Sequence, residues 1–454
     1  MSFPPDFVWG VAASAYQIEG AVAADGRGKS IWDTFCRTPG AVFQGHTGDV
    51  ACDHYNRVEE DVRLIRDIGA RAYRFSIAWP RVMPDGVGPV NAKGLAFYDR
   101  LVDTLLAAGI TPYVTLFHWD YPEALYHRGG WLNRDSAAWF ADYTHAVVHA
   151  LSDRVAHWMT LNEPQVFLKF GHADGTNAPG LKLPLSEQLL ATHHVLLAHG
   201  RGMQALRAAA RQPLKAGWAC VCVVKYPQSP ADIDAARAGT CGVLEPHLWN
   251  NTWYNDPAFT GEYPADGLRL FGAAMPKVDP ADMAIIRQPM DFLGINIYEG
   301  QPVRAAAPSA GGPPGAPVAC VRPPGFPTTA FHWPVEPESL YWGPRFMHER
   351  YNVPIYITEN GLSNNDWVSL DGQVHDPQRI DFTRRYLLAL RRARADGVDV
   401  RGYFHWSLMD NFEWSAGYRE RFGLVHVDYA TQTRTPKDSA RWYRSVIERN
   451  AENL

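Results

Sequence analysis

Two glutamates each stand directly after a short run of residues that favours a β-strand. Glu359 follows residues 355–358 (IYIT), in which β-forming side chains alternate before the chain turns at Gly361. Glu163 follows a similar run at residues 155–162 and precedes Pro164, which cannot donate to a strand ladder. An acid at the carboxyl end of an apolar strand is where a (β/α)8 barrel carries its chemistry. Two such acids facing each other could combine nucleophilic and acid–base catalysis.

The rest of the chain supplies the elements that such a barrel needs. We predict strands at residues 7–14, 72–79, 110–119, 155–164, 215–224, 291–298, 355–358 and 400–408. Helical periodicity marks residues 56–68, 92–108, 135–152, 186–211, 337–350, 377–396 and 437–449. Eight strands alternating with helices predict a single (β/α)8 barrel, a TIM barrel, with long βα loops forming the active-site rim over residues 1–454.

Three segments between these elements lack a regular pattern. We expect a long loop at residues 165–185 and an irregular, aromatic-rich segment at residues 232–275. Residues 300–329 are rich in Pro, Gly and Ala, as an interdomain linker would be. Because strands and helices with the same alternation resume after them, we interpret this segment as a long loop over one rim of the barrel.

The order of the strands gives an expected distance between the two acids. Eight strands about 4.8 Å apart and tilted by about 36° make a barrel of roughly 7.5 Å radius. Glu163 ends the fourth strand and Glu359 the seventh, which places their carboxyl groups about 6 Å apart once each side chain reaches inward by about 4 Å. Glycoside hydrolysis uses carboxyls about 5–5.5 Å apart for retention and about 6.5–9.5 Å apart for inversion. The estimate suits this chemistry but does not choose between the two outcomes.

The residues around the acids favour different roles for them. Arg74 lies within a predicted strand, where a charge is costly unless a carboxylate pairs with it. Asn296 and Tyr298 are two residues apart on another strand and therefore face the same way. Arg74 and Tyr298 are the candidates for keeping Glu359 ionised as a nucleophile. We predict a drier site for Glu163, the higher pKa of the two acids, and the role of general acid.

Aromatic residues make up 12% of the chain and include 16 Trp, many of which stand beside His, Asn, Glu or Asp. This pattern indicates a pocket with flat apolar faces and polar edges, which suits a sugar ring. Gln17 is a candidate for binding hydroxyl groups, because its amide can both donate and accept a hydrogen bond.

Charge and composition exclude several other classes of function. The net charge is −5 with both signs interspersed, which argues against a nucleic-acid or polybasic membrane surface. No apolar run approaches the length that spans a bilayer, and residues 1–7 have no features of a signal peptide. The six cysteines contain no CxxC pair, so we expect free thiols and a cytoplasmic protein. His193, His194 and His199 lack an acid or cysteine to complete a metal site, and we expect neither a metal nor a cofactor.

Six motifs occur in the order typical of one enzyme family. They are residues 7–20 (FVWGVAASAYQIEG), 73–81 (YRFSIAWPR), 160–164 (TLNEP), 292–298 (FLGINIY), 357–361 (ITENG) and 406–414 (WSLMDNFEW). With these motifs the sequence resembles family 1 glycoside hydrolases of the β-glucosidase type along essentially its whole length. The resemblance implies an exo-acting β-glycosidase that retains anomeric configuration, with Glu359 as nucleophile and Glu163 as acid/base.

The resemblance also implies the residues that bind the substrate, a β-linked glucoside or oligosaccharide. The nonreducing sugar would contact Gln17, His118, Trp119, Asn162, Trp406, Glu413, Trp414 and Phe422, with Trp406 as a stacking floor. Asn296, Tyr298 and Arg74 would support the catalytic pair, and Trp333 would line the leaving-group side. Galactosyl and fucosyl residues would be cleaved beside glucosyl residues.

Two branches of the family differ from this sequence at single residues. Thioglucosidases carry Gln in place of the acid/base, whereas Glu163 is present here. The 6-phospho-β-glycosidases carry Ser where Glu413 stands, and a carboxylate there would repel phosphate. A non-phosphorylated sugar is therefore favoured. A transglycosylase that uses the same intermediate and a non-catalytic sugar-binding barrel are the alternatives, and we keep a homo-oligomer as a hypothesis.

Overall fold

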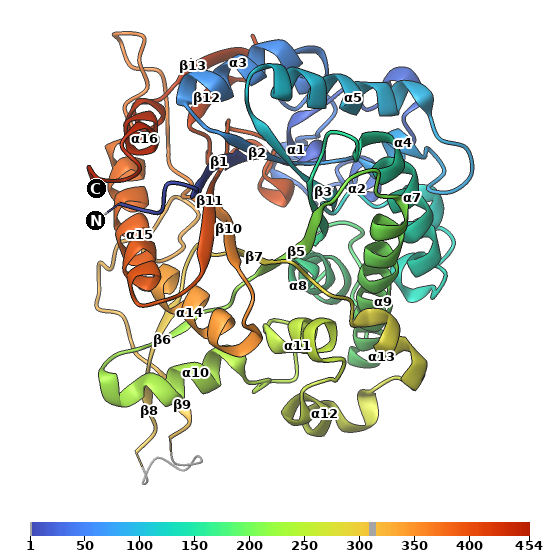
Figure 1. The fold of residues 1–454 in the computed structure, drawn as a ribbon, viewed down its shortest axis with the longest axis vertical. Helices are drawn as coiled ribbons and strands as arrows, with labels where there is room; N and C mark the ends of the chain where they lie inside the picture. The colour runs from blue at the N-terminus through green and yellow to red at the C-terminus, as the bar shows by residue number, and fades with distance from the viewer. Residues whose placement is uncertain (1, 308–314) are drawn as a thin grey trace.

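Eight parallel strands close into a barrel in the computed structural model of the chain, which describes residues 2–307 and 315–454 (Figure 1). Around the barrel the strands follow the order β1-β11-β10-β7-β5-β4-β3-β2. Their bounds are β1 (Val8–Ala12), β2 (Ala72–Ser76), β3 (Thr111–Phe117), β4 (His157–Asn162), β5 (Lys215–Val221), β7 (Leu293–Asn296), β10 (Ile355–Asn360) and β11 (Val400–Trp406). The predicted (β/α)8 architecture is confirmed.

Helices surround the barrel, and the longer ones follow the predicted ranges within two residues at either end. They are α3 (Val58–Ile68), α5 (Ala92–Ala107), α7 (Ser136–Leu151), α9 (Leu185–Ala209), α14 (Ser339–Tyr351), α15 (Pro377–Ala395) and α16 (Asp438–Glu448). In α3, Val58, Val62 and Ile65 recur on one face, and all three are buried against the core. Gly69 ends this helix because its φ of 81° is a left-handed conformation that glycine adopts at little cost.

Side chains of very different size fill the inside of the barrel. Ala12, Ala72 and Ala219 lie in one buried cluster with Tyr113 and Phe404. Gly10 of β1 also makes room, since a Cβ at this position would lie 2.4 Å from Cδ1 of the Phe404 ring. The interior is therefore a packed core, and the pocket for a ligand must lie above it, at the carboxyl ends of the strands.

The three segments without a predicted pattern contain more structure than expected. Residues 165–185 begin with α8 (Pro164–Leu168) and a π-helical turn, η5 (Lys169–Ala173). Residues 232–275 hold α10 (Ile233–Cys241), α11 (Thr252–Thr260) and α12 (Ala265–Phe271), and α13 (Pro280–Ile286) follows. Their helical pattern was missed because each helix is short and Pro257 lies inside α11.

The expected long loop at residues 300–329 is partly wrong. It carries β8 (Gln301–Ala305) and β9 (Pro317–Ala319), which form a small three-stranded sheet with β6 (Lys225–Pro227). Figure 1 shows this sheet outside the barrel, next to α10. Proline and alanine within these short strands hid them from a propensity argument. Residues 308–314 of the segment lie outside the described residues.

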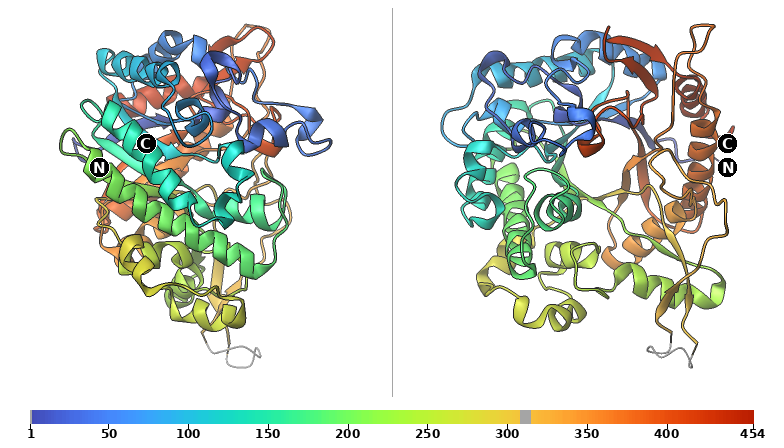
Figure 2. Two further views of the ribbon diagram at one scale, coloured as in Figure 1. Left: turned by 90° about the vertical axis from the view of Figure 1, so that its right-hand side faces the viewer. Right: turned by 180° about the vertical axis from the view of Figure 1, so that it is seen from behind.

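The remaining short elements decorate the carboxyl-end loops and the edge of the fold. They are α1 (Ala15–Ile18), α2 (Ile31–Phe35), α4 (Trp79–Val82), α6 (Glu123–Tyr126) and the hairpin of β12 (Val425–Asp428) and β13 (Thr433–Pro436). The two chain ends lie near each other beside α15 (Figure 2). Among residues 2–307 and 315–454, no helix combines the length and apolarity required to cross a bilayer. That residues 1–454 form a single domain stays a prediction.

Candidate active site

Glu359 lies near the carboxyl end of β10, where two donors hold its carboxyl group. Arg74 Nη1 donates to Oε1 at 2.5 Å, and Tyr298 Oη donates to Oε2 at 2.6 Å. Arg74 comes from β2, and Tyr298 stands two residues after β7. Both predicted contacts are confirmed, and both favour the ionised form of a carboxyl group. Burial and the charge of Glu359 raise the pKa of Tyr298 well above its ordinary value, so its hydroxyl remains a donor.

The strand β10 is longer than predicted and includes Glu359 and Asn360. The pairing of β10 with β7 shifts register between Ile357 and Glu359, and the shift sets Glu359 level with Asn296. Such irregularities re-aim a side chain at the rim of a barrel. Gly361 follows at a close approach, since a Cβ there would lie 1.9 Å from the carbonyl oxygen of Trp406.

Glu163 stands between β4 and α8 and is buried. Its φ of 47° is a left-handed conformation, which for a residue other than glycine is found preferentially at functional sites. Asn296 Nδ2 donates to Glu163 Oε1 at 3.0 Å. Burial and then the charge of Glu359 raise the pKa of Glu163 well above its ordinary range, against the opposing effects of Asn296 and Arg74. A raised pKa favours the protonated form, which a general acid needs.

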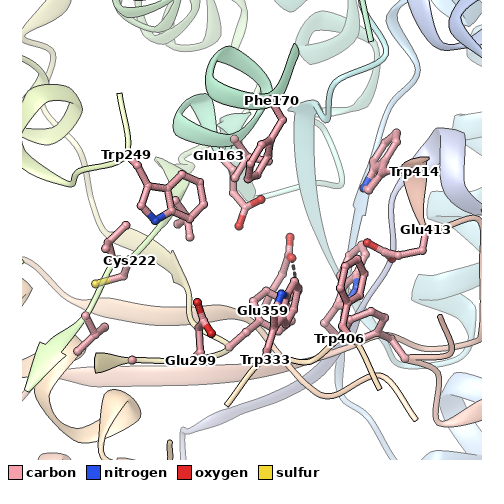
Figure 3. Close-up of a pocket in the computed structure, with 18 of the residues that line it drawn as sticks. Glu163, Phe170, Cys222, Trp249, Glu299, Trp333, Glu359, Trp406, Glu413 and Trp414 are labelled. Carbon is pink, nitrogen blue, oxygen red and sulfur yellow. Dashed lines mark hydrogen bonds between the residues drawn. The ribbon is translucent and has the colours of Figure 1, made fainter. Parts of the chain in front are cut away.

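A pocket of about 570 Å³ opens above the packed interior and contains both acids. Figure 3 shows the carboxyl groups of Glu163 and Glu359 facing each other across it. Trp406, Glu413 and Trp414 lie on one side of this pair, and Trp249, Cys222 and Glu299 lie on the other. The acids therefore divide the pocket into two halves, as a bond to be cleaved between two groups would require.

The half of the pocket that contains Glu413 is rich in buried polar groups. Gln17 Nε2, from α1, donates to Glu413 Oε2 at 3.1 Å. Burial and the charges of Glu359 and Glu420 raise the pKa of Glu413 to about 8. This pair offers adjacent donors and acceptors, which matches the hydroxyl groups of a sugar. A raised pKa favours the uncharged form of Glu413, which would weaken the repulsion of phosphate that the sequence predicts from its charge.

Asn162 connects this half to the acid pair through its side-chain amide. Its Oδ1 accepts from Arg74 Nη2 at 2.6 Å and from Asn296 Nδ2 at 3.1 Å. Its Nδ2 lies 3.1 Å from Nε2 of His118, whose pKa is lowered by burial and by the charge of Arg74. His118 is therefore neutral, and its ring is fixed at the pocket wall.

Five aromatic side chains complete the predicted set and also line the pocket, namely Trp119, Trp333, Trp406, Trp414 and Phe422. Trp119 Nε1 donates to the backbone oxygen of Asn162 at 2.9 Å, so its indole N–H is occupied and its ring packs 4.6 Å from that of Trp414. Trp406 lies parallel to the ring of His118 at 5.9 Å. On the other side, the Trp333 ring lies 5.9 Å from that of Phe422 and 5.2 Å from that of Tyr298.

The structure brings all the predicted site residues together. Gln17, Arg74, Asn162 and Asn296 lie behind the wall and contact residues that line it. Sequence reasoning missed several lining residues in the other half, which are Phe170, Asn177, Cys222, Lys225, Trp249, Glu299 and Arg322. Phe170, Asn177, Trp249 and Arg322 come from the segments without a predicted pattern, whereas Cys222, Lys225 and Glu299 lie at or just after the ends of predicted strands. One signal was available, because Glu299 directly follows Tyr298 after a strand.

No group of three or more His, Cys, Asp or Glu in the described part of the chain could hold a metal ion. His193 contacts Asp282 and the hydroxyl of Tyr263, whereas His199 contacts Thr160 on β4. These separate partners indicate packing roles for the histidines. The six cysteines are free thiols, and Cys220 and Cys222 are buried, as predicted.

A (β/α)8 barrel with two facing carboxyl groups in an aromatic pocket defines the class of glycoside hydrolases. The family model described as glycosyl hydrolase family 1 matches residues 1–452. The chain belongs to this family.

Individual relatives agree along nearly the whole chain. A 1,4-beta-D-glucan glucohydrolase of Thermotoga neapolitana is 46% identical over 455 residues, which cover 99% of this chain and 98% of the relative. A bifunctional beta-D-glucosidase/beta-D-fucosidase of Bifidobacterium breve is 42% identical and covers 98% of each chain. The solved structure of a beta-glucosidase from Thermotoga maritima in complex with glucoimidazole superposes with a TM-score of 0.90 at 44% identity, covering 99% of both chains.

Proposed function

We propose that this chain is a retaining β-glucosidase, which removes terminal β-D-glucosyl residues from the nonreducing end of its substrates. The observation that carries the proposal is the pair of facing carboxyl groups in opposite surroundings. Glu359 is bound by a guanidinium and a phenol, whereas Glu163 is buried beside that charge and has a raised pKa. Opposite surroundings are what an ionised nucleophile and a protonated acid need.

In the first step, the Glu359 carboxylate attacks the anomeric carbon from below the sugar ring. The bond between this carbon and the glycosidic oxygen breaks, and the proton of Glu163 passes to that oxygen as the leaving group departs. A covalent glucosyl ester of Glu359 results. When the ester forms, Glu359 loses its negative charge, and its hydrogen bonds from Arg74 and Tyr298 become weaker.

In the second step, water enters where the leaving group was. Glu163, now ionised, takes a proton from the water, whose oxygen bonds to the anomeric carbon. The ester bond to Glu359 breaks, and both carboxyl groups return to their starting states. Two inversions give net retention. A sugar hydroxyl in place of water would give a transglycosylation product from the same intermediate.

The half of the pocket that contains Glu413 binds the glucosyl residue in this proposal. Glu413 and His118 supply hydrogen bonds to its hydroxyls, Gln17 positions Glu413 from behind the wall, and Trp406 stacks on the apolar face of the sugar. The relative of B. breve is named for both a glucosidase and a fucosidase activity. We extend the proposal to β-galactosyl and β-fucosyl residues as secondary substrates. Measuring kcat/KM for the three p-nitrophenyl glycosides ranks them.

The test compares the chain with its Glu359→Ala variant on p-nitrophenyl β-D-glucoside. The parent should release β-glucose first, as detected by proton NMR before the anomers equilibrate. The variant should be inactive until azide is added and should then form the α-glucosyl azide, because azide fills the space of the missing carboxylate. Full activity in the variant, or α-glucose as the first product of the parent, would refute the assignment.

The cellular location of the chain and its assembly into oligomers are also proposals. The six free cysteines support a reducing, cytoplasmic location. A homo-oligomer stays a hypothesis, which sedimentation or light scattering of the purified chain can decide.

A further inference from the structure

The half of the pocket opposite the glucosyl side carries two charged side chains that no part of the proposed mechanism uses. Lys225 and Glu299 both line this half; Lys225 is half-buried, and Glu299 is exposed. Within the described residues, neither side chain makes a hydrogen bond or an ion pair, and the hydrogen bonds of Lys225 are made by its backbone. Partial burial lowers the pKa of Lys225 and raises that of Glu299. Both charged groups therefore lack a protein partner and stay available to a ligand in the pocket.

Glu299 is held firmly although its carboxyl group is unpaired. It stands between Tyr298, which contacts Glu359, and Gly300. Arg322 Nη2 donates to the backbone oxygen of Gly300 at 2.7 Å, and Arg322 Nε donates to Glu336 Oε1 at 2.9 Å. A Cβ on Gly300 would lie 2.9 Å from Cβ of Ser339, so the turn packs closely against α14. The charge of Arg322 is thus satisfied by Glu336, and the turn presents Glu299 to the pocket.

Lys225 is positioned by the small sheet outside the barrel. It is the first residue of β6 and pairs in register with Gln301 of β8. Its aliphatic stem crosses α10 at Gly239, where a Cβ would lie 2.9 Å from Cγ of Lys225. Its backbone N–H and C=O both bond to the hydroxyl of Thr240. The ammonium is therefore the only part of this residue that is free to bind a ligand among the contacts of the described chain.

Flat rings stand beside these two charges. The rings of Phe170 and Trp249 pack 5.5 Å apart, and those of Phe331 and Trp333 stack at 4.7 Å. Figure 3 shows Trp249 and Trp333 on either side of Glu299 in the view. Aromatic faces with a donor and an acceptor between them match a second pyranose ring, whose C–H faces are apolar and whose rim carries hydroxyls.

We propose that Lys225 and Glu299 bind hydroxyl groups of a sugar in the leaving-group position and thereby select oligosaccharides over glucosides of phenols and alkyl alcohols. The proposal rests on the proposed function and specifies the substrate class of its second half-site. A sugar supplies the hydrogen bonds that both charges lack. An apolar leaving group would desolvate them further without compensation, and sites built to bond hydroxyls discriminate against partners that lack them.

The test measures kcat/KM for cellobiose and for p-nitrophenyl β-D-glucoside in the full chain and in Lys225→Met and Glu299→Gln. Each variant should lose about 10- to 100-fold on cellobiose, the usual value of a hydrogen bond to a charged group. On the phenyl glucoside each should change by less than about 3-fold, because the nitrophenyl ring makes no such bond. Lys277→Met and Glu187→Gln are the matched controls, since both residues are exposed and neither lines the pocket.

Activity on the phenyl glucoside also shows that a variant is folded. A loss of kcat/KM on cellobiose alone can therefore be attributed to the leaving-group half of the pocket. An equal loss on both substrates, or no loss on cellobiose, overturns the proposal while leaving the β-glucosidase assignment intact. A parent chain that cleaves neither substrate refutes the assignment and this proposal together.

Discussion

Replacing Glu163 by Gln tests the division of labour between the two acids. The amide has nearly the same shape, and its oxygen can still accept the hydrogen bond from Asn296 Nδ2, which is 3.0 Å long in the parent. The substitution therefore removes the transferable proton and leaves the packing of the site in place. Its effect should depend on how much the leaving group needs that proton.

The expected magnitude follows from the leaving group. A sugar hydroxyl departs only with a proton, and general acid catalysis is worth about 10²- to 10⁴-fold, or roughly 2.7–5.4 kcal/mol of transition-state stabilisation. We expect this loss in kcat/KM for cellobiose. A 2,4-dinitrophenolate is stable without a proton, so kcat/KM for its glucoside should fall by less than about 10-fold. Stopped-assay glucose release and continuous absorbance at 400 nm, roughly the phenolate band, measure the two rates.

The pH dependence gives a second readout. Burial and the charge of Glu359 raise the pKa of Glu163, so its acid form persists to higher pH than that of an ordinary glutamate and is lost as the pH rises further. In the parent, kcat/KM should therefore fall on the alkaline side, and Glu163→Gln should lack this limb. Glu413→Gln is the control, because it loses a buried acid that we propose contacts the glucosyl residue, and it should slow both substrates equally. Equal losses on both substrates in Glu163→Gln, or an unchanged alkaline limb, would contradict the assignment.

Two further predictions follow from single contacts. Asn296→Ala removes the hydrogen bond that favours the charged form of Glu163, so the pKa of Glu163 should rise and the alkaline limb of kcat/KM should move to higher pH; a limb that stays or moves to lower pH counts against this role. Lys437 lies fully buried between Asp366, at 2.5 Å, and Asp410, at 2.7 Å. Lys437→Met leaves two buried carboxylates without this partner and should lower the free energy of unfolding by about 3–5 kcal/mol in denaturant titration, whereas exposed Lys277→Met should change it by less than about 0.5 kcal/mol.

The barrel was predictable because its elements carry strong periodic patterns. The helix α3 repeats Val58, Val62 and Ile65 on one face and stops at Gly69, and both features are local. The ends of the strands were less certain. Glu359 was expected just after its strand and lies within it, because the pairing partners of β10 decide where the ladder stops, and a short stretch of sequence does not contain them.

The two halves of the pocket differed in how well the sequence predicted them. Residues of the glucosyl half, such as Gln17 and Glu413, stand in motifs next to barrel strands, so the fold determines their place. Lys225 and Trp249 belong to the opposite half and come from segments outside the barrel repeat. Their position depends on the pairing of β6 with β8 and on the packing of short helices, which are contacts between residues far apart in the chain. Local pattern holds no information about such contacts.

The two acids and the two charged residues of the opposite half, Lys225 and Glu299, are positioned by different parts of the fold. Asn296 joins the strands of the acids, since its Nδ2 donates to Glu163 and its Oδ1 accepts from the hydroxyl of Thr358 at 2.6 Å. The distance between the acids is thus set by β4, β7 and β10 inside the barrel. Lys225 is instead set by the outer sheet, and Glu299 by the turn that Arg322 holds. Substitutions in the outer sheet can therefore change which leaving group is accepted without moving the acids, so specificity and chemistry should separate in variants of this chain.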